Sequence, residues 1–239
     1  MRRNSAQSVK KTELKPHLKS QWCIAKGEDA AFVAAMEDIL DLYCQPYDQR
    51  CPLICMDEKP YQLLGEVRPP IALSPGKPRK EDYEYVRKGT CSIFVFCEPL
   101  TGWVQAHARE RRTKVDWAEE IRWLLEEAYP DAPKIRLVCD NLNTHIYSSL
   151  YQAFEAKKAR ELARRLEIHY TPKHGSWLNI AEIQISVLAR QCLCRRIPDL
   201  FLLNQELTAW HCCHRPAPVD WRFSTVHARI KLKYLYPRI

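Results

Sequence analysis

Residues 52–58 read PLICMDE, an apolar run that ends in two acidic side chains. A short, continuous apolar run of this kind is typical of a fully buried strand. Residues 135–140, which read IRLVCD, repeat the pattern, and residues 92–97, which read SIFVFC, carry the strongest strand signal of the chain. A carboxylate at the end of a buried strand costs free energy unless something neutralises it. Asp57 and Asp140 are therefore the first candidates for a functional site.

The spacing of apolar residues predicts the elements on either side. Steps of three and four residues indicate helices at 30–43, 114–129, 148–154, 156–166, 178–194 and 199–212. Further strands are predicted at 103–108 and 168–170, and the five prolines within 59–90 predict a loop or a short hairpin. Three closely connected strands, followed by strands that alternate with helices, fit an α/β mixed sheet flanked by helices on both faces. This is the element order of the ribonuclease-H-like fold.

The chain has 239 residues, which is room for one substantial domain with appendages. We expect a basic linker arm and amphipathic helix over 1–48, a ribonuclease-H-like catalytic domain over 49–212 and a basic C-terminal tail over 213–239. The formal net charge is +8, and the Lys and Arg residues are concentrated at the two ends. Basic ends on a slightly acidic body favour a polyanionic partner. No run of 18 apolar residues occurs, so we expect no membrane partner.

Cysteine usage bears on the compartment. The chain has eleven cysteines, an odd number, and Cys55, Cys91, Cys97 and Cys139 lie within apolar runs. This pattern predicts buried free thiols in a reducing cytoplasm and not a disulfide scaffold.

A third acid completes the candidate site. Glu182 is expected in the first turns of the helix predicted at 178–194. Carboxylate ligands alone suit Mg²⁺ or Mn²⁺. Because neighbouring strands lie about 4.8 Å apart, Asp57 and Asp140 on adjacent strands would share one ion while Glu182 holds a second. Two ions about 3.5–4 Å apart clamp the attacking and leaving oxygens of a phosphodiester. Each such acid taken singly is more often a cap or a turn residue, so the prediction rests on all three.

The three acids lie in the segments 55–58 (CMDE), 138–145 (VCDNLNTH) and 175–182 (GSWLNIAE). In this order the segments resemble the acidic motifs of the IS630 family of transposases, within the Tc1/mariner superfamily of DDE enzymes. The resemblance implies that Asp57, Asp140 and Glu182 are the catalytic and metal-binding triad, with two Mg²⁺ or Mn²⁺ ions. It also implies that water cleaves transposon-end DNA and that the freed 3′-hydroxyl then attacks target DNA.

The resemblance further implies double-stranded DNA as partner, a homo-oligomer in the DNA complex, and a location in the bacterial cytoplasm with the nucleoid. Full-length family members carry an N-terminal helix-turn-helix region, and this chain begins in what resembles the linker after it. We therefore expect either a separately encoded helix-turn-helix protein or a truncated copy. Two other interpretations stay open: a DNA-binding remnant that no longer cuts, and a ribonuclease-H-like nuclease without strand transfer.

Three residues near the triad in the sequence are candidates for supporting or binding roles. Glu58 should point to the opposite face of its strand from the residue before it, which favours a supporting role. His145 either caps the loop that follows the second acidic strand or helps to hold metal-bound water or a DNA phosphate. Trp177 is interpreted as a core or elbow aromatic in preference to one that stacks on a base.

Basic side chains supply the candidate DNA contacts. Lys173 and His174 come just before the helix of Glu182, and a second cluster comprises Arg111, Arg112 and Lys114. Contacts of such residues with phosphates would make binding strongly salt-dependent while adding little sequence specificity.

Overall fold

The computed structural model describes residues 27–238. The predicted basic arm therefore lies almost entirely outside the described residues, and it stays a prediction. Helix α2 (Ala30–Tyr43) forms as its apolar spacing predicts, and Asp29 caps it by accepting a hydrogen bond from the Phe32 amide at 2.9 Å.

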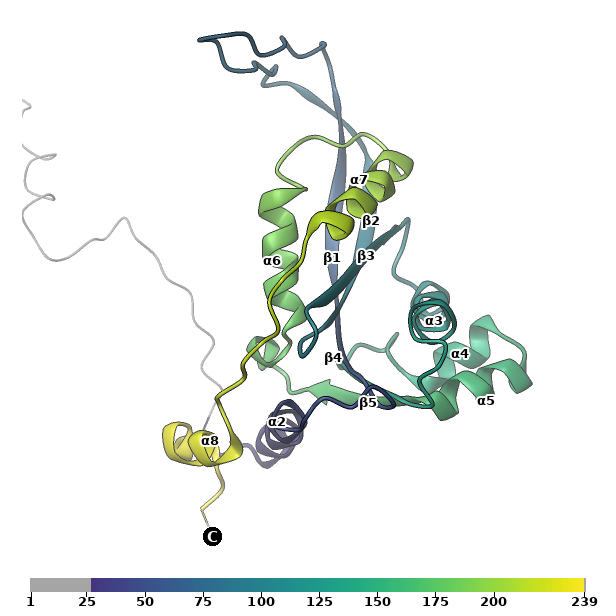
Figure 1. Ribbon diagram of the computed structural model, residues 1–239, viewed down its shortest axis with the longest axis vertical. Coiled ribbons are helices and arrows are strands. Elements are labelled where there is room, and N and C mark those ends of the chain that lie inside the picture. Colours follow the sequence, from purple (N-terminus) through teal and green to yellow (C-terminus); the bar gives the residue numbers. More distant parts are fainter. Residues whose placement is uncertain (1–26, 239) are drawn as a thin grey trace, which may run out of the picture.

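One mixed sheet organises the chain (Figure 1). Its strands lie in the order β3-β2-β1-β4-β5, and their bounds are β1 Leu53–Glu66, β2 Tyr85–Glu98, β3 Trp103–Arg109, β4 Ile135–Asp140 and β5 Leu166–Thr171. β1 pairs with β2, and β2 with β3, in antiparallel orientation, whereas β4 and β5 are parallel to β1. The predicted mixed α/β sheet is thus confirmed.

Residues 59–90, predicted as a loop or a short hairpin, form a hairpin that is longer than predicted. β1 continues to Glu66 and pairs with β2 along its length, so the two strands form a long ribbon that projects from the body in Figure 1. Pro60 lies inside this strand. Proline is tolerated there because β4 pairs with β1 only from Leu53 to Cys55, which leaves one side of β1 without a ladder beyond that point.

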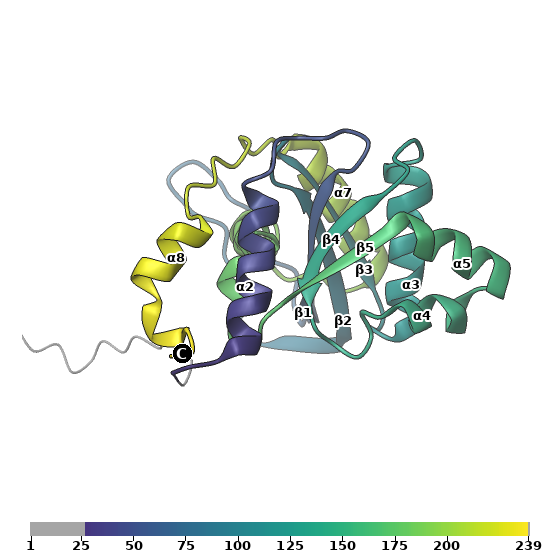
Figure 2. The same cartoon turned by 90° about the horizontal axis from the view of Figure 1, so that it is seen from below.

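Helices cover both faces of the sheet (Figure 2). One face packs under α3 (Lys114–Trp123), α4 (Tyr147–Ala153) and α5 (Ala156–Arg165), and the other under α2, α6 (Ala181–Gln191), α7 (Leu200–Cys213) and α8 (Thr225–Lys231). Side chains of a strand alternate between the faces. Accordingly Ile54 and Met56 join the first core, whereas Cys55 joins the second.

Three helical segments differ from their prediction. The helix predicted to reach residue 129 continues beyond α3 as a π-helix, Leu124–Ala128. The helix predicted from 178 is preceded by a 3₁₀ turn, Ser176–Leu178, and starts only at Ala181. α8 was not predicted, because its short, weakly apolar stretch is stabilised by α2: Arg229 pairs with Glu37 at 2.8 Å.

The predicted burial of four cysteines is confirmed. Cys55, Cys91, Cys97 and Cys139 are buried, and every cysteine within residues 27–238 is free. Over the same residues no helix is both long and apolar enough to cross a membrane.

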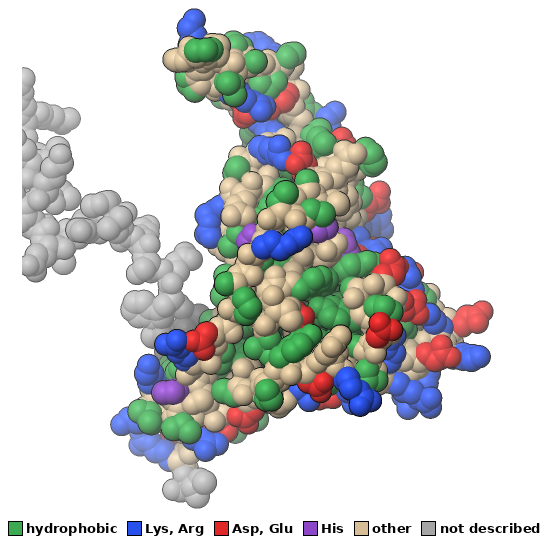
Figure 3. Space-filling model, viewed as in Figure 1, with side chains coloured by type: hydrophobic (Ala, Val, Ile, Leu, Met, Phe, Trp, Pro, Cys, Tyr) green, Lys and Arg blue, Asp and Glu red, His purple; other side chains and the backbone are tan. Residues whose placement is uncertain are grey.

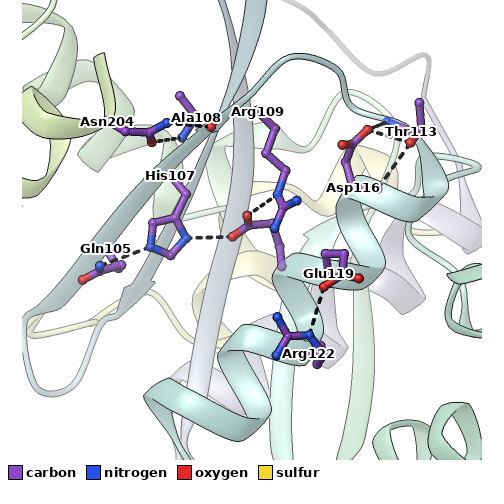
Figure 4. A network of polar contacts seen from close by, with 10 residues as sticks. Gln105, His107, Ala108, Arg109, Thr113, Asp116, Glu119, Arg122 and Asn204 are labelled. Atoms are coloured by element: carbon purple, nitrogen blue, oxygen red, sulfur yellow. Dashed lines mark hydrogen bonds and ion pairs between the residues drawn. The ribbon is translucent and has the colours of Figure 1, made fainter. Parts of the chain in front are cut away.

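A side chain closes the outer edge of the sheet (Figure 4). β3 is the last strand on its side, so part of its backbone lacks a strand partner. The Asn204 side chain on α7 accepts a hydrogen bond from the Ala108 amide at 2.8 Å and donates one to the Ala108 carbonyl at 3.0 Å. Asn204 therefore replaces one residue of a neighbouring strand.

Replacement of Asn204 by alanine tests this role. Asn204→Ala leaves a buried donor and a buried acceptor of Ala108 unpaired, and each such group costs about 1–3 kcal/mol. We expect the free energy of unfolding, measured by urea titration, to fall by about 2 kcal/mol. The neighbouring exposed Gln205→Ala should change it by less than about 0.5 kcal/mol. Equal stability of the two variants would show that the edge does not need Asn204.

Candidate active site

The two aspartates lie side by side at the end of a parallel strand pair. β1 and β4 are in register with Cys55 opposite Val138, so Asp57 and Asp140 each follow two residues later. Cys55 and Val138 belong to the same core cluster. Because side chains two residues apart share a face, both aspartates point to the face that carries α6.

Glu182 reaches this edge from the first turn of α6. The Asn179 amide, just before the helix, donates to the Met56 carbonyl at 2.9 Å and accepts from the Ala181 amide at 3.1 Å. One side chain therefore joins the start of α6 to the residue before Asp57. Asp57 and Glu182 line a common cavity of about 450 Å³. Asp140 lines a second cavity, of about 610 Å³.

Asp57 carries the electrostatic signature of a shared acidic site. Burial raises the pKa of the Asp57 carboxyl to about 7, and the negative charges of Asp140, Glu58 and Glu182 add to this effect, whereas the Glu58 amide opposes it. Among the ion pairs of the described residues, none involves Asp57 or Glu182. The protein thus concentrates negative charge here without a lysine or arginine that pairs with it.

A buried histidine, His145, lies between Glu58 and Asp140. His145 Nε2 is 2.7 Å from Glu58 Oε1, and its Nδ1 is 3.0 Å from the Asp140 carbonyl oxygen and 2.7 Å from Asp140 Oδ1. Burial alone would lower the pKa of His145, but the contacts with Asp140, Cys139 and Glu58 outweigh it and raise the pKa to about 12. The raised pKa favours the protonated form of His145, which lies between the carboxyl groups of Glu58 and Asp140.

Glu58, Asp140 and His145 bring ligand atoms within 4.8 Å of one another, and they are the one such group in the described part of the chain. Their geometry nevertheless favours a support over a metal site. The His145 and Glu58 side chains are 0% and 2% exposed, and the imidazole ring stacks on Trp117 at 5.7 Å. Both imidazole nitrogens already have oxygen partners, so a cation would have to displace a proton from a closed pocket.

The three acids predicted from the sequence fit a divalent cation better. They offer only carboxylate oxygens, the ligands that Mg²⁺ and Mn²⁺ prefer. Asp140 Oδ1 is buried and lies 2.7 Å from His145 Nδ1 without a hydrogen bond of good geometry. The ligand atoms of Asp57, Asp140 and Glu182 are not all within 4.8 Å of one another.

The predicted basic contacts divide into two groups. Lys173 and His174 line the cavity of Asp140 and are exposed. Arg111, Arg112 and Lys114 line neither of the two cavities beside the acids. The turn of Lys173 is tightly built: His174 adopts a left-handed φ of 65°, and a Cβ on Gly175 would meet Pro172 Cγ at 2.6 Å.

Two interpretations of the neighbours are now settled. Glu58 does point to the face opposite Asp57 and has the supporting position predicted for it. Trp177 is not a core residue, since its side chain is 46% exposed, but it lies in the turn before α6, which fits the elbow alternative. The role of His145 as partner of Glu58 was missed, because the two residues are 87 positions apart and no local pattern links them.

The chain resembles known proteins in family and in fold. The family model described as DDE superfamily endonuclease matches residues 52–203. The structure aligns with the Mos1 mariner paired-end complex with Mn at a TM-score of 0.54 and 12% identity, over 88% of this chain and 63% of that one. The corresponding complex with Mg gives 0.53 and 13%, over 98% and 71%. The catalytic domain of Mos1 transposase gives 0.51 and 10%, over 80% and 86%.

At these identities the likeness shows the fold, and the predicted ribonuclease-H-like fold is confirmed. The chain spans less than two thirds of the Mos1 chain in the complex with Mn. No curated protein matches the sequence significantly.

The pairing of His145 with Glu58 can be tested by measuring the stability of the protein. His145→Ala removes the partner of a carboxylate that is 2% exposed, and an uncompensated buried charge costs about 3–5 kcal/mol. We expect the free energy of unfolding, measured in EDTA, to fall by about that amount. His174→Asn is the matched control, since asparagine tolerates the left-handed backbone of this exposed position. A His145 variant as stable as the control would disprove the buried ion pair.

Proposed function

The chain belongs to the DDE superfamily endonucleases, and from this premise we propose that it is the catalytic domain of a DNA transposase of the IS630 type. The observation that supports the proposal is that Asp57 follows β1 beside Asp140 in the strand register and shares a cavity with Glu182 of α6. The substrates are the phosphodiester bonds at transposon ends and in target DNA.

The proposed reaction has two steps. Water hydrolyses a phosphodiester at the transposon end, which leaves a free 3′-hydroxyl and a 5′-phosphate. That hydroxyl then attacks a target phosphodiester, so one bond forms as another breaks and no external energy source is needed. Bound Mg²⁺ or Mn²⁺, two ions in the proposal, would supply a metal-activated nucleophile and stabilise charge on the phosphate.

The residues of the chain have distinct tasks in this proposal. Asp57 is the central ligand, because it lies next to Asp140 in the strand register and shares a cavity with Glu182. Lys173 and His174 contact the DNA backbone beside Asp140. His145 and Glu58 do not touch DNA and hold Asp140 in place from behind.

The partners follow from the reaction. Related structures are described as paired-end and strand-transfer complexes of Mos1. By analogy we propose that this chain binds double-stranded transposon ends and target DNA, and that it acts as a homo-oligomer because two ends must be joined to one target. Recognition of the terminal repeats would come from a helix-turn-helix segment.

Metal binding can be measured without catalysis. Addition of Mg²⁺ or Mn²⁺ at about a hundred times the dissociation constant should add about 2.7 kcal/mol to the free energy of unfolding, seen as a rise in Tm. Asp57→Asn should abolish the rise. Asp131→Asn, an exposed aspartate at the opposite end of β4, should keep it. A rise that survives in Asp57→Asn would exclude this residue as a ligand.

Activity is tested with labelled DNA that carries the terminal repeats, a circular target and Mg²⁺ or Mn²⁺. Asp57→Asn, Asp140→Asn and Glu182→Gln should each reduce cleavage by at least about a hundredfold, because each removes a metal ligand. Asp131→Asn should cleave normally. Strand joining by the unaltered protein supports a transposase. Nicking without joining would identify a nuclease, and binding without either would identify a remnant.

A further inference from the structure

Trp177 occupies an unusual position for a large aromatic residue. It is 46% exposed, although the next residue in its turn, Leu178, is completely buried. The backbone of the turn is fixed, because the Tyr43 hydroxyl donates to the Leu178 carbonyl at 2.6 Å. The indole is therefore held at the surface by a rigid support.

The C-terminal segment brings further rings and charge to this place. The Phe223 ring lies 5.9 Å from that of Trp177 at 72°, an edge contact that leaves almost half of the indole in solvent. His227 stacks on Phe223 at 6.1 Å, and Lys231 Nζ lies 5.9 Å from the Phe223 ring centre. In the space-filling view of Figure 3, Lys and Arg side chains surround hydrophobic ones over α8.

This group borders the acidic site. Ser176, the residue before Trp177, lines the cavity of Asp140. Asn179, two residues after it, is hydrogen-bonded to the carbonyl of Met56, next to Asp57. Trp177 thus lies on the short turn that links the two cavities.

We propose that Trp177, with Phe223, His227 and Lys231, forms a stacking platform for an unpaired base of the DNA strand whose phosphate lies at the acidic site. The inference rests on the proposed function and adds to it a nucleobase subsite. Proteins that bind single strands combine aromatic rings, on which bases stack, with cations that follow the backbone. The platform has both, and an exposed cationic surface suits DNA better than an apolar protein partner.

The platform acts by lowering the cost of exposing a base. Removal of a base from a duplex costs a few kcal/mol, and an enzyme that must place a backbone phosphate deep in a site benefits if the neighbouring base is taken up elsewhere. Trp177 offers a ring that is already positioned. Lys231 would attract the adjacent phosphate, so stacking and charge act on neighbouring parts of one nucleotide.

The test measures binding of fluorescein-labelled single-stranded DNA of about ten thymidines, by anisotropy in EDTA. Trp177→Ala should weaken binding roughly tenfold, and Trp177→Phe should retain most of it. Phe201→Ala, which removes another exposed aromatic side chain, should bind normally. Affinity for a duplex of the same length should stay within about twofold in every variant, since a paired base has no free face.

Salt dependence separates stacking from charge. Trp177→Ala should leave the slope of log affinity against log salt unchanged, whereas Lys231→Met should reduce it by about 0.7. Single-strand binding that is absent in the unaltered protein, or equal in Trp177→Ala, would overturn the platform. So would a change of oligomeric state in Trp177→Ala with binding intact, because the indole would then serve contacts between copies. Cleavage by the triad is scored independently, so either proposal can fail while the other stands.

Discussion

The parallel pairing of β1 with β4 is the constraint on which the site depends. Its ladder covers only Leu53 to Cys55 on β1, and the strands then continue without a common ladder. The register places Asp57 and Asp140 side by side, each at the edge of a cavity. A shift by one residue would turn one aspartate to the opposite face of the sheet, since side chains alternate. The site is therefore specified by the same pattern that specifies the core.

Concentrated negative charge has to be stabilised in a protein that must also fold without its cations. The chain balances part of this charge internally, because His145 lies between Glu58 and Asp140 and its raised pKa favours the protonated form. Asp57 and Glu182 have no such partner among the described residues, and burial raises the pKa of Asp57 to about 7. Asp140 thus has an internal partner in His145, whereas Asp57 and Glu182 have no ion-pair partner among the described residues.

Much of this could be predicted from the sequence because it depends on local pattern. The apolar runs before Asp57 and Asp140 defined two strands, and alternation placed Glu58 on the opposite face. The pairing of Glu58 with His145 could not be predicted, because it depends on strand register. The continuation of β1 through Pro60 was missed for a similar reason, since only the extent of the β4 ladder shows that this proline lies on an unpaired side. α8 was missed because α2 stabilises it more than its own sequence does.

The C-terminal segment, which the sequence predicts as a basic tail, also makes packing contacts that support the candidate site. Trp221 packs on Tyr43 with ring centres 4.7 Å apart, and the Tyr43 hydroxyl holds the Leu178 carbonyl. That carbonyl belongs to the turn from which Asn179 reaches β1 and after which Glu182 begins its helix. A chain of direct contacts therefore runs from the last part of the sequence to the third acid. Because each link is a packed ring or a hydrogen bond of a buried group, displacement of the tail would disturb the position of Glu182 as well as the aromatic surface beside it.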